Sequence, residues 1–408
     1  MSWDVIIAGA GPAGLAAAFA AEAEGAKVLL LEHAGFVGGM LTEGMIHVLC
    51  GMSSASLYKE ITKRLIIRMG HRQVYDTESM KEFFLEKLLG SSIELMLHTT
   101  VLGADCENGS IKGIRVLTRG GIEELTAPLY IDATGNGDLA FNCGVGFDMG
   151  REEDGLCQPA SLYMRLAGVD TRKFTEFIET NREAVTQKLQ KAVADGEVPA
   201  PAGHVIMAPE VRDGYLRLNM TNATGVDGTD SRSMTRAELL CRSQVQPLLR
   251  FIRRNVPGCE QAFVVQTASY TGVRESRRFH CVYQLNEYDL AEAKVFDDWI
   301  ATRCRFGFDV HDVKGHGIAT QTLHAKPDYT IPYRSLQPLG VDNLLLAGRC
   351  IGGTHLAHSS YRVMPICMAM GQAAGVAAAQ CARRGVVYAE ADVAAIQKTL
   401  LAQGISEP

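Results

Sequence analysis

Three glycines near the amino terminus, Gly9, Gly11 and Gly14, have the spacing of a phosphate-binding turn. The apolar segment 4–8 precedes them and predicts a buried strand, and the alanine-rich segment 14–24 follows and predicts a helix. Gly9 permits a tight turn, Gly11 lets the backbone approach a pyrophosphate, and Gly14 permits close packing of helix on strand. The free N–H groups at the helix N-terminus would bind the anion.

The next apolar segment, 27–32, completes a strand–helix–strand unit and ends in Glu32. A carboxylate at this position accepts hydrogen bonds from both hydroxyls of an adenosine ribose and repels a 2′-phosphate. Glycine-rich turns also occur in proteins that bind nothing there. Here the strand, helix, second strand and carboxylate follow in the required order, which favours a dinucleotide site.

Two later turns repeat the pattern of an apolar strand followed by glycine. Ala133 and Gly135 follow the strand predicted from Leu129, and Gly348 and Arg349 follow the strand predicted from Asn343. Ligands of parallel α/β sheets bind at the carboxyl ends of the strands, so we expect both turns beside the dinucleotide.

A charged run, 271–278, contains three arginines and one glutamate. Such runs usually form a solvated surface, and we interpret Arg277 and Arg278 as solvated or paired with acidic neighbours. Arg274 follows an apolar approach and the flexible Gly272, so we predict that it points inward and binds a substrate carboxylate or a developing oxyanion.

Histidines are candidate acid–base groups because their pKa lies near neutral pH. His311, His316 and His324 lie near the expected end of an inserted segment, and His355 and His358 follow the turn at residue 348. We favour His324 and His358 as catalytic residues, although a structural role is the common alternative for any single histidine. No pair has the helical spacing of metal ligands, so no metal site is expected.

The elements that must position these residues predict an α/β fold of 408 residues in two units. Asn-Gly and Gly-Gly turns predict a three-stranded meander within 93–125. We expect a Rossmann-like domain made of residues 1–154 and 326–408. An α+β substrate domain, 155–325, is inserted in it, with long helices at 171–195 and from Thr235 to Pro257.

Composition excludes some classes of partner. With 40 basic and 46 acidic residues, the chain has a net charge of −6, which gives no reason to expect nucleic acid or an anionic membrane. A small-molecule substrate is the expectation, and the oligomeric state stays open. The eleven cysteines form no C-x-x-C pair, so we expect reduced thiols and a cytoplasmic protein. The first strand begins almost at Met1, so we expect no targeting segment and no membrane span.

With these motifs the chain resembles FAD-dependent oxidoreductases of the glutathione-reductase-like and fumarate-reductase-like flavoprotein superfamily. The resemblance rests on the runs 271–278, 331–335, 342–349 and 362–375. It implies one FAD bound by both ends of the chain, with its isoalloxazine near Met40. Many members carry Gly-Asp where this chain has Gly348-Arg349, and an arginine suits a phosphate. The implied FAD-binding residues are Gly9, Gly11, Pro12, Ala13, Gly14, Glu32, His33, Gly39, Met40, Val101, Ala133, Gly135, Gly348, Arg349, Val363 and Met364.

The activity implied is hydride transfer between flavin N5 and a small organic substrate with an anionic, carbonyl, hydroxyl or amine group. The helix predicted from Pro365 would direct its N-terminus at the negative charge of the reduced flavin. Close packing by Gly371 and Gly375 is the alternative role of that helix. Non-redox isomerase or lyase chemistry and a non-enzymatic FAD-binding role also remain open, as does a covalent flavin bond at His33, His47 or Cys50.

Overall fold

The computed structural model describes residues 2–70, 72–202, 205–315 and 317–408. A five-stranded parallel sheet of order β18-β9-β1-β2-β5 carries the amino-terminal glycine turn. The central strand β1 pairs with β2 and β9 in register, so the turns after β1 and β9 lie at one edge of the sheet. The strands are β1 (Val5–Ala8), β2 (Val28–Leu31), β5 (Glu94–Met96), β9 (Leu129–Asp132) and β18 (Leu344–Leu346).

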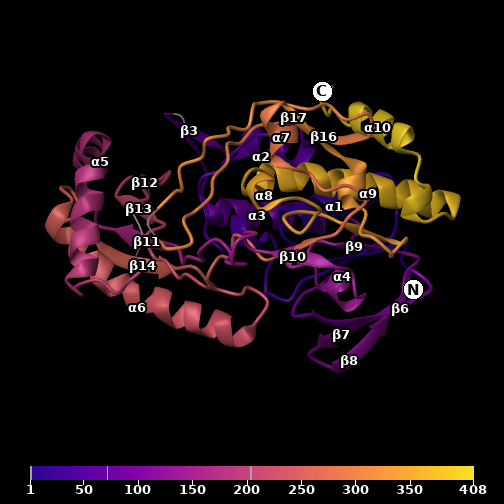
Figure 1. The fold of residues 1–408 in the computed structure, drawn as a ribbon, viewed down its shortest axis with the longest axis horizontal. Helices are drawn as coiled ribbons and strands as arrows, with labels where there is room; N and C mark the ends of the chain where they lie inside the picture. The colour runs from indigo at the N-terminus through magenta and orange to yellow at the C-terminus, as the bar shows by residue number, and fades with distance from the viewer. Residues whose placement is uncertain (1, 71, 203–204, 316) are drawn as a thin grey trace.

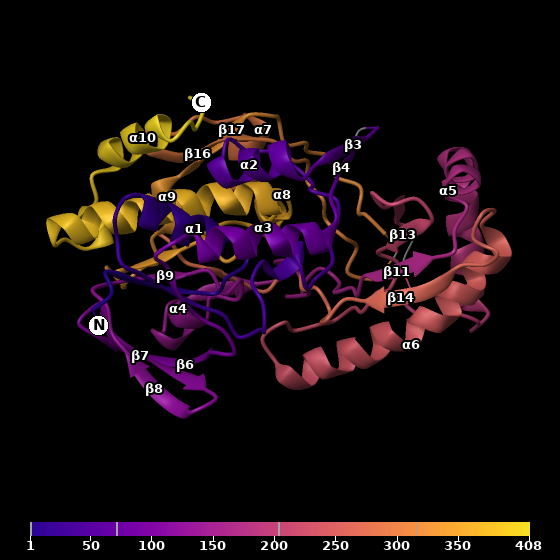
Figure 2. The same cartoon turned by 180° about the vertical axis from the view of Figure 1, so that it is seen from behind.

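Helices α1 (Pro12–Ala23) and α9 (Met364–Arg384) pack in close contact on this sheet. A Cβ added at Gly371 would lie 2.0 Å from the carbonyl oxygen of Ala13, and one at Gly375 would lie 2.1 Å from that of Ala17. The predicted role of these two glycines in close packing is therefore confirmed. Figure 2 shows α2 (Ser56–Arg64), α3 (Thr77–Leu89) and α10 (Val393–Ala402) on the same side of the molecule as α1 and α9.

The predicted meander lies on the other side, beside α4 (Asp138–Asn142). Its strands are β6 (Thr100–Glu107), β7 (Ser110–Thr118) and β8 (Gly121–Leu125), each antiparallel to the next. Asn108 and Gly109 both have positive φ, 49° and 73°, which is why an Asn-Gly turn joins β6 to β7.

One disulfide joins the meander to the sheet-bearing unit. Cys106 on β6 and Cys143, just after α4, are bonded, with Cα atoms 5.5 Å apart. The expectation of reduced thiols is wrong for this pair, because β6 packs against α4 and brings together two cysteines whose sequence separation carries no signal. The other cysteines of the chain are free.

A second hydrophobic core is built on an antiparallel sheet of order β12-β13-β11-β14. Its helix α6 begins at Ser231, where the Asp230 side chain accepts the N–H of Ser233. The predicted start at Thr235 is wrong because Asp230 is the N-cap. The bounds are β11 (Met164–Ala167), β12 (Met207–Pro209), β13 (Tyr215–Leu218), β14 (Phe263–Thr267), α5 (Thr171–Ala194) and α6 (Ser231–Asn255).

Figure 1 shows this second core as a separate lobe beside the parallel sheet. It contains Met45 and buried residues between 160 and 268, whereas Phe279 and later residues pack into the first core. We therefore propose that the inserted part ends between 268 and 279, earlier than residue 325.

The remaining elements are β3 (Ile67–Met69), β4 (Arg72–Val74), β10 (Phe147–Met149), β15 (Arg277–Phe279), α7 (Glu287–Ala291), β16 (Trp299–Cys304), β17 (Tyr329–Pro332), α8 (His355–Tyr361) and the 3-10 turns η1 (Gly39–Leu41), η2 (Tyr333–Leu336) and η3 (Tyr388–Glu390).

Across the described ranges, no single helix is long and apolar enough to cross a membrane. Helices α8 and α9 reach the required length and composition only as a pair bent by 89°.

Candidate functional site

The glycine turn after β1 has one open position and two closed ones. A Cβ at Gly9, where φ is 93°, would lie 2.6 Å from the Ala133 carbonyl oxygen, and one at Gly14 would lie 1.8 Å from that of Gly9. Packing therefore requires glycine at both positions. At Gly11, the N-cap of α1, an added Cβ would meet nothing within 4 Å. The helix N-terminus thus faces a space into which a ligand phosphate can come close.

Glu32 lies at the end of β2, directly beside this turn. Its side chain is only 6% exposed, and its two oxygens accept the N–H groups of Ala10 and Ala34, both at 2.9 Å. Burial acts to raise the pKa of this carboxyl, but the hydrogen bonds from His33 and Ala34 outweigh it and lower the pKa. The carboxylate is therefore held ionised and oriented. Oε1 accepts from both His33 and Ala34, whereas Oε2 accepts from Ala10 and keeps a second lone pair for a ribose hydroxyl.

Arg349 is brought to the same place from the far end of the chain. Gly348 has a φ of 104°, and a Cβ there would lie 3.4 Å from Cβ of Ala13 on α1. The Arg349 guanidinium donates through Nη2 to Oδ1 of Asn136 at 2.8 Å and lies against Gly135. Its Nε is buried and has no hydrogen-bond partner in the described part of the chain. A partly buried cation with a buried, unused donor beside a helix N-terminus is suited to a phosphate.

Asp132 fixes the turn that carries Asn136. Its carboxylate is fully buried and accepts the N–H groups of Leu139 and Ala140 at 2.7 and 3.1 Å, which holds the first turn of α4. Burial raises the pKa of Asp132 to about 6. The sequence places this residue in a predicted strand and carries no signal of this role.

A cavity of about 330 Å³ lies between η1, the N-terminus of α9 and the strands of the second core. Gly39, at the start of η1, joins the cavity to the glycine turn, since a Cβ there would lie 3.3 Å from Cα of Gly11. The cavity is lined by Met40, Ile46, Val48, Cys50, Ser161, Tyr163, Ile206, Asn219, Gly272, Val273, Arg274, Phe306, Asp309, His311, Ile318, Arg349, Arg362, Val363 and Met364.

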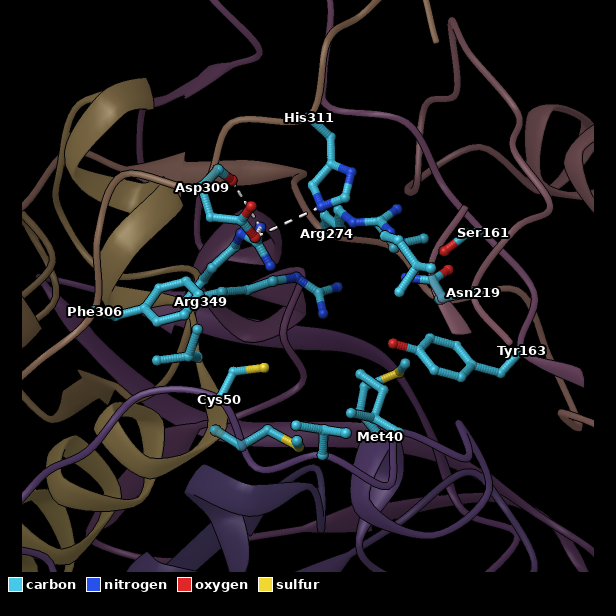
Figure 3. Close-up of a pocket in the computed structure, with 18 of the residues that line it drawn as sticks. Met40, Cys50, Ser161, Tyr163, Asn219, Arg274, Phe306, Asp309, His311 and Arg349 are labelled. Atoms are coloured by element: carbon cyan, nitrogen blue, oxygen red, sulfur yellow. Dashed lines mark hydrogen bonds and ion pairs between the residues drawn. The ribbon is translucent and has the colours of Figure 1, made fainter. Parts of the chain in front are cut away.

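Arg274 lines this cavity next to His311 (Figure 3), so the prediction that it points inward is confirmed. Its Nη1 donates to the carbonyl oxygen of Pro159 at 2.5 Å. Burial, together with the charge of Arg362, lowers the pKa of Arg274 to about 10. Within the described ranges no carboxylate forms an ion pair with it, because the nearby Asp309 pairs with Arg362 and His311 instead.

Asp309 and His311 face Arg274 in Figure 3. The sequence offered His311 as one of five candidate histidines and gave no signal for Asp309. Nη2 of Arg362 donates to Oδ2 of Asp309 at 2.9 Å, and Nε2 of His311 lies 3.6 Å from the same oxygen. Burial and the charge of Arg274 lower the pKa of His311 to about 4. His311 is therefore neutral at pH 7 in this state.

The two favoured histidines do not reach the cavity. His324 is exposed on the loop before β17, and His358 is fully buried in α8, where neither ring nitrogen has a described partner. Burial and Arg278 lower the pKa of His358 well below its usual value. Of the other candidates, His355 lies 2.7 Å from Glu275, and His316 lies outside the described residues.

The charged run 271–278 is not a solvated surface. Arg278 is buried and pairs with the fully buried Glu275, and Arg277 is buried over the ring of Phe141, 3.8 Å from its centroid, with Asp138 at 3.5 Å. The solvated alternative is wrong and the paired alternative is correct. The reason is that β15 pairs with β10 and packs Phe279 into the first core, so the strand is buried.

A family model described as FAD dependent oxidoreductase matches residues 4–400. The chain belongs to this family. Among solved structures, a geranylgeranyl bacteriochlorophyll reductase-like protein of Thermoplasma acidophilum is similar, with 14% identity, a TM-score of 0.54, and coverage of 99% of this chain and 84% of that one. The flavin-dependent brominase Bmp2 has 12% identity and a TM-score of 0.50, with coverage of 98% and 83%. No curated protein matches the chain.

FAD is the cofactor of the family, and the residues present fit it. The open position at Gly11 and the unused Nε of Arg349 suit the pyrophosphate, and Glu32 suits the adenosine ribose. Met40, Val363 and Met364 line the cavity in which the isoalloxazine is expected. Val101, on β6, lies partly buried against the first core.

The three candidate residues for a covalent flavin bond differ in their access to the cavity. Cys50 faces the cavity, whereas His47 is buried and His33 is largely exposed beside Glu32. Cys50 is exposed to the cavity, where the loss of bulk water around the thiol and the charge of Asp309 raise its pKa, which disfavours the reactive thiolate. In the described part of the chain, no group of three or more His, Cys, Asp or Glu residues is placed to hold a metal ion.

Proposed function

We propose that this protein transfers a hydride between N5 of its FAD and a small anionic substrate bound in the cavity. The observation that carries this proposal is Arg274, a partly buried cation that faces the cavity and has no ion pair within the described ranges. Burying an unpaired charge costs several kcal/mol, so such a group is usually kept for a ligand of opposite charge.

The roles of the side chains follow from their positions. Arg274 would bind a carboxylate with its two-pronged guanidinium, and Ser161 and Asn219 supply further polar contacts on the same wall. Val48, Phe306 and other apolar residues exclude water from the rest of the cavity. FAD, when bound, supplies the hydride acceptor or donor.

The N-terminus of α9 opens on the cavity at Val363, its N-cap, and Met364. Its N–H groups are a source of positive potential for the charge that flavin reduction creates. A second G-x-G-x-x-G motif after a strand, which a nicotinamide-binding domain would supply, is missing from the sequence. The second electron carrier would therefore use this cavity or a partner, and dehydrogenase, oxidase and reductase activities stay equal alternatives.

Replacement of Arg274 tests the anion site. We expect Arg274→Lys to keep the flavin spectrum and to lose about tenfold or more in kcat/KM, or about 1.4 kcal/mol, because lysine keeps the charge but not the geometry. The assay is anaerobic flavin reduction or reoxidation by small carboxylates with a hydroxyl, amine or carbonyl group. Arg172→Lys, at a side chain that is 89% exposed, is the matched control. Equal turnover by Arg274→Ala and the parent would contradict the assignment.

A further inference from the structure

We propose that His311, held by Asp309, exchanges the proton that accompanies hydride transfer in the cavity. This inference rests on the proposed function and identifies a further catalytic residue for it. His311 lines the cavity, whereas His324 and His358 lie outside it.

Both residues of this Asp–His pair are fixed in place. The backbone N–H of His311 donates to Oε1 of Gln158 at 3.1 Å, and a β-bridge joins His311 to Ile318 across the same loop. Asp309 is held by Nη2 of Arg362, which donates to its Oδ2 at 2.9 Å and its carbonyl oxygen at 3.0 Å. The His311 side chain is 13% exposed, and it lines the cavity together with Asp309 and Arg274. A substrate anchored by Arg274 would thus lie against the imidazole.

The chemistry needs one proton acceptor. When a hydride leaves a carbon that bears a hydroxyl or amino group, the C–H electron pair departs with it. The O–H or N–H electron pair then becomes the new C=O or C=N bond, and one proton remains. The imidazole of His311 takes that proton, and the carboxylate of Asp309 balances the charge of the imidazolium. In the direction of reduction, the imidazolium returns the proton as the hydride arrives.

Anion binding and proton uptake are coupled in this arrangement. Among the residues that the structure describes, Asp309, Arg274 and Arg362 are charged groups that act on His311, and Arg274 is the largest of these charges that opposes its protonation. A bound carboxylate neutralises Arg274, so the pKa of His311 rises when substrate is present. By linkage, proton uptake must then tighten anion binding by the same factor.

The other titratable groups that line the cavity do not take up a proton between about pH 4 and pH 7. Arg349 also lines the cavity and stays charged, since arginine does not lose its proton near neutral pH. Burial raises the pKa of Tyr163 to about 12 and also raises that of the Cys50 thiol, so both stay neutral in weak acid. Burial acts to raise the pKa of Asp309, but His311 and Arg362 outweigh it and hold it far below the usual range. Of the described residues that line the cavity, His311 is the one that changes charge between about pH 4 and pH 7.

Benzenesulfonate is a suitable probe because it is a permanent anion with an apolar ring, and benzamide is its neutral control. We would measure binding to the holoenzyme by calorimetry in buffers of different ionisation enthalpy, which counts the protons taken up. The parent protein should bind benzenesulfonate at least about threefold more tightly at pH 5 than at pH 7, with proton uptake. His311→Gln should bind with an affinity that does not change with pH and without proton uptake. Benzamide should cause no uptake in either protein.

Control variants separate the two proposals. His280→Gln changes another histidine paired with an aspartate, Asp148 at 3.3 Å, and should leave the proton uptake as in the parent. Arg274→Gln should lose benzenesulfonate binding at both pH values. If the parent does not bind benzenesulfonate, or if Arg274→Gln binds it as tightly as the parent does, the cavity is not an anion site and the proposed function fails. If binding needs Arg274 but proton uptake persists in His311→Gln and His311→Asn, the role of His311 is overturned and the proposed function stands.

Discussion

Adding one methyl group at Gly11 or at Gly14 should separate what the fold needs from what FAD needs. Gly11 has a φ of −74° and a ψ of −170°, which alanine adopts without strain, and its added Cβ would meet nothing within 4 Å. The Cβ of alanine at position 14 would instead lie 1.8 Å from the carbonyl oxygen of Gly9, so α1 or the turn must move. Gly11→Ala should therefore weaken FAD binding, whereas Gly14→Ala should lower the stability of the folded protein.

The two variants should differ both in the free energy of unfolding and in the affinity for FAD. For Gly11→Ala we expect the free energy of unfolding of the apoprotein to change by less than about 1 kcal/mol, because the backbone suits alanine and nothing is displaced. The methyl group stands between the α1 N–H groups and the pyrophosphate. Loss of one hydrogen bond to that anion removes about 1.5–3 kcal/mol, a roughly 10- to 100-fold loss in FAD affinity. For Gly14→Ala we expect overpacking to cost the apoprotein about 1–3 kcal/mol or more.

Two measurements on each variant are sufficient. Urea unfolding of the apoprotein gives the stability, and titration of the apoprotein with FAD gives the affinity. Gly11→Val should go further and purify without flavin while it keeps its folded circular dichroism spectrum. If Gly11→Ala and Gly11→Val retain FAD like the parent, the turn does not face the cofactor and the placement of the pyrophosphate is wrong.

Two further predictions concern Glu32 and His358. Glu32→Ala should weaken FAD binding by about 1.5–3 kcal/mol in a fluorescence titration, because a carboxylate bound to the ribose is lost, and an unchanged affinity would remove Glu32 from the site. His358 is buried with its pKa well below the usual value, so below about pH 6.5 the unfolded chain binds a proton that the folded protein does not. Stability should then fall with decreasing pH by up to about 1.4 kcal/mol per pH unit from this residue. His358→Leu should show a shallower decline in urea unfolding between about pH 6.5 and pH 5, and an equal slope would mean that the imidazole is protonated in the folded state.

The strand–turn–helix geometry of the proposed nucleotide site was predictable because its requirements are local. Gly9, Gly11 and Gly14 stand between a strand and a helix, and Glu32 ends the next strand, so one segment of sequence contains the whole pattern. The meander was predictable for the same reason, since Asn108 and Gly109 supply the positive φ values that its turn needs.

The substrate half was predictable only in part. Arg274 was identified from its apolar approach, but its partners in the cavity come from distant segments: Asn219 lies just after β13 and Asp309 lies between β16 and β17. Only the packing of the second core against the first brings them together. The same holds for the disulfide between Cys106 and Cys143 and for the burial of His358, because neither depends on neighbouring sequence.

The central claim, hydride transfer between FAD and a small anionic substrate, is tested most directly by following the flavin absorbance without oxygen. The oxidised holoenzyme is mixed with small hydroxy and amino acids, and the photoreduced holoenzyme with small oxo and unsaturated acids. The account predicts that one of these bleaches or restores the flavin absorbance in step with conversion of the substrate. Deuterium on the transferred position should slow that step. Conversion of a substrate while the flavin absorbance stays constant, and equally fast with 5-deaza-FAD in place of FAD, would contradict the account and favour non-redox chemistry.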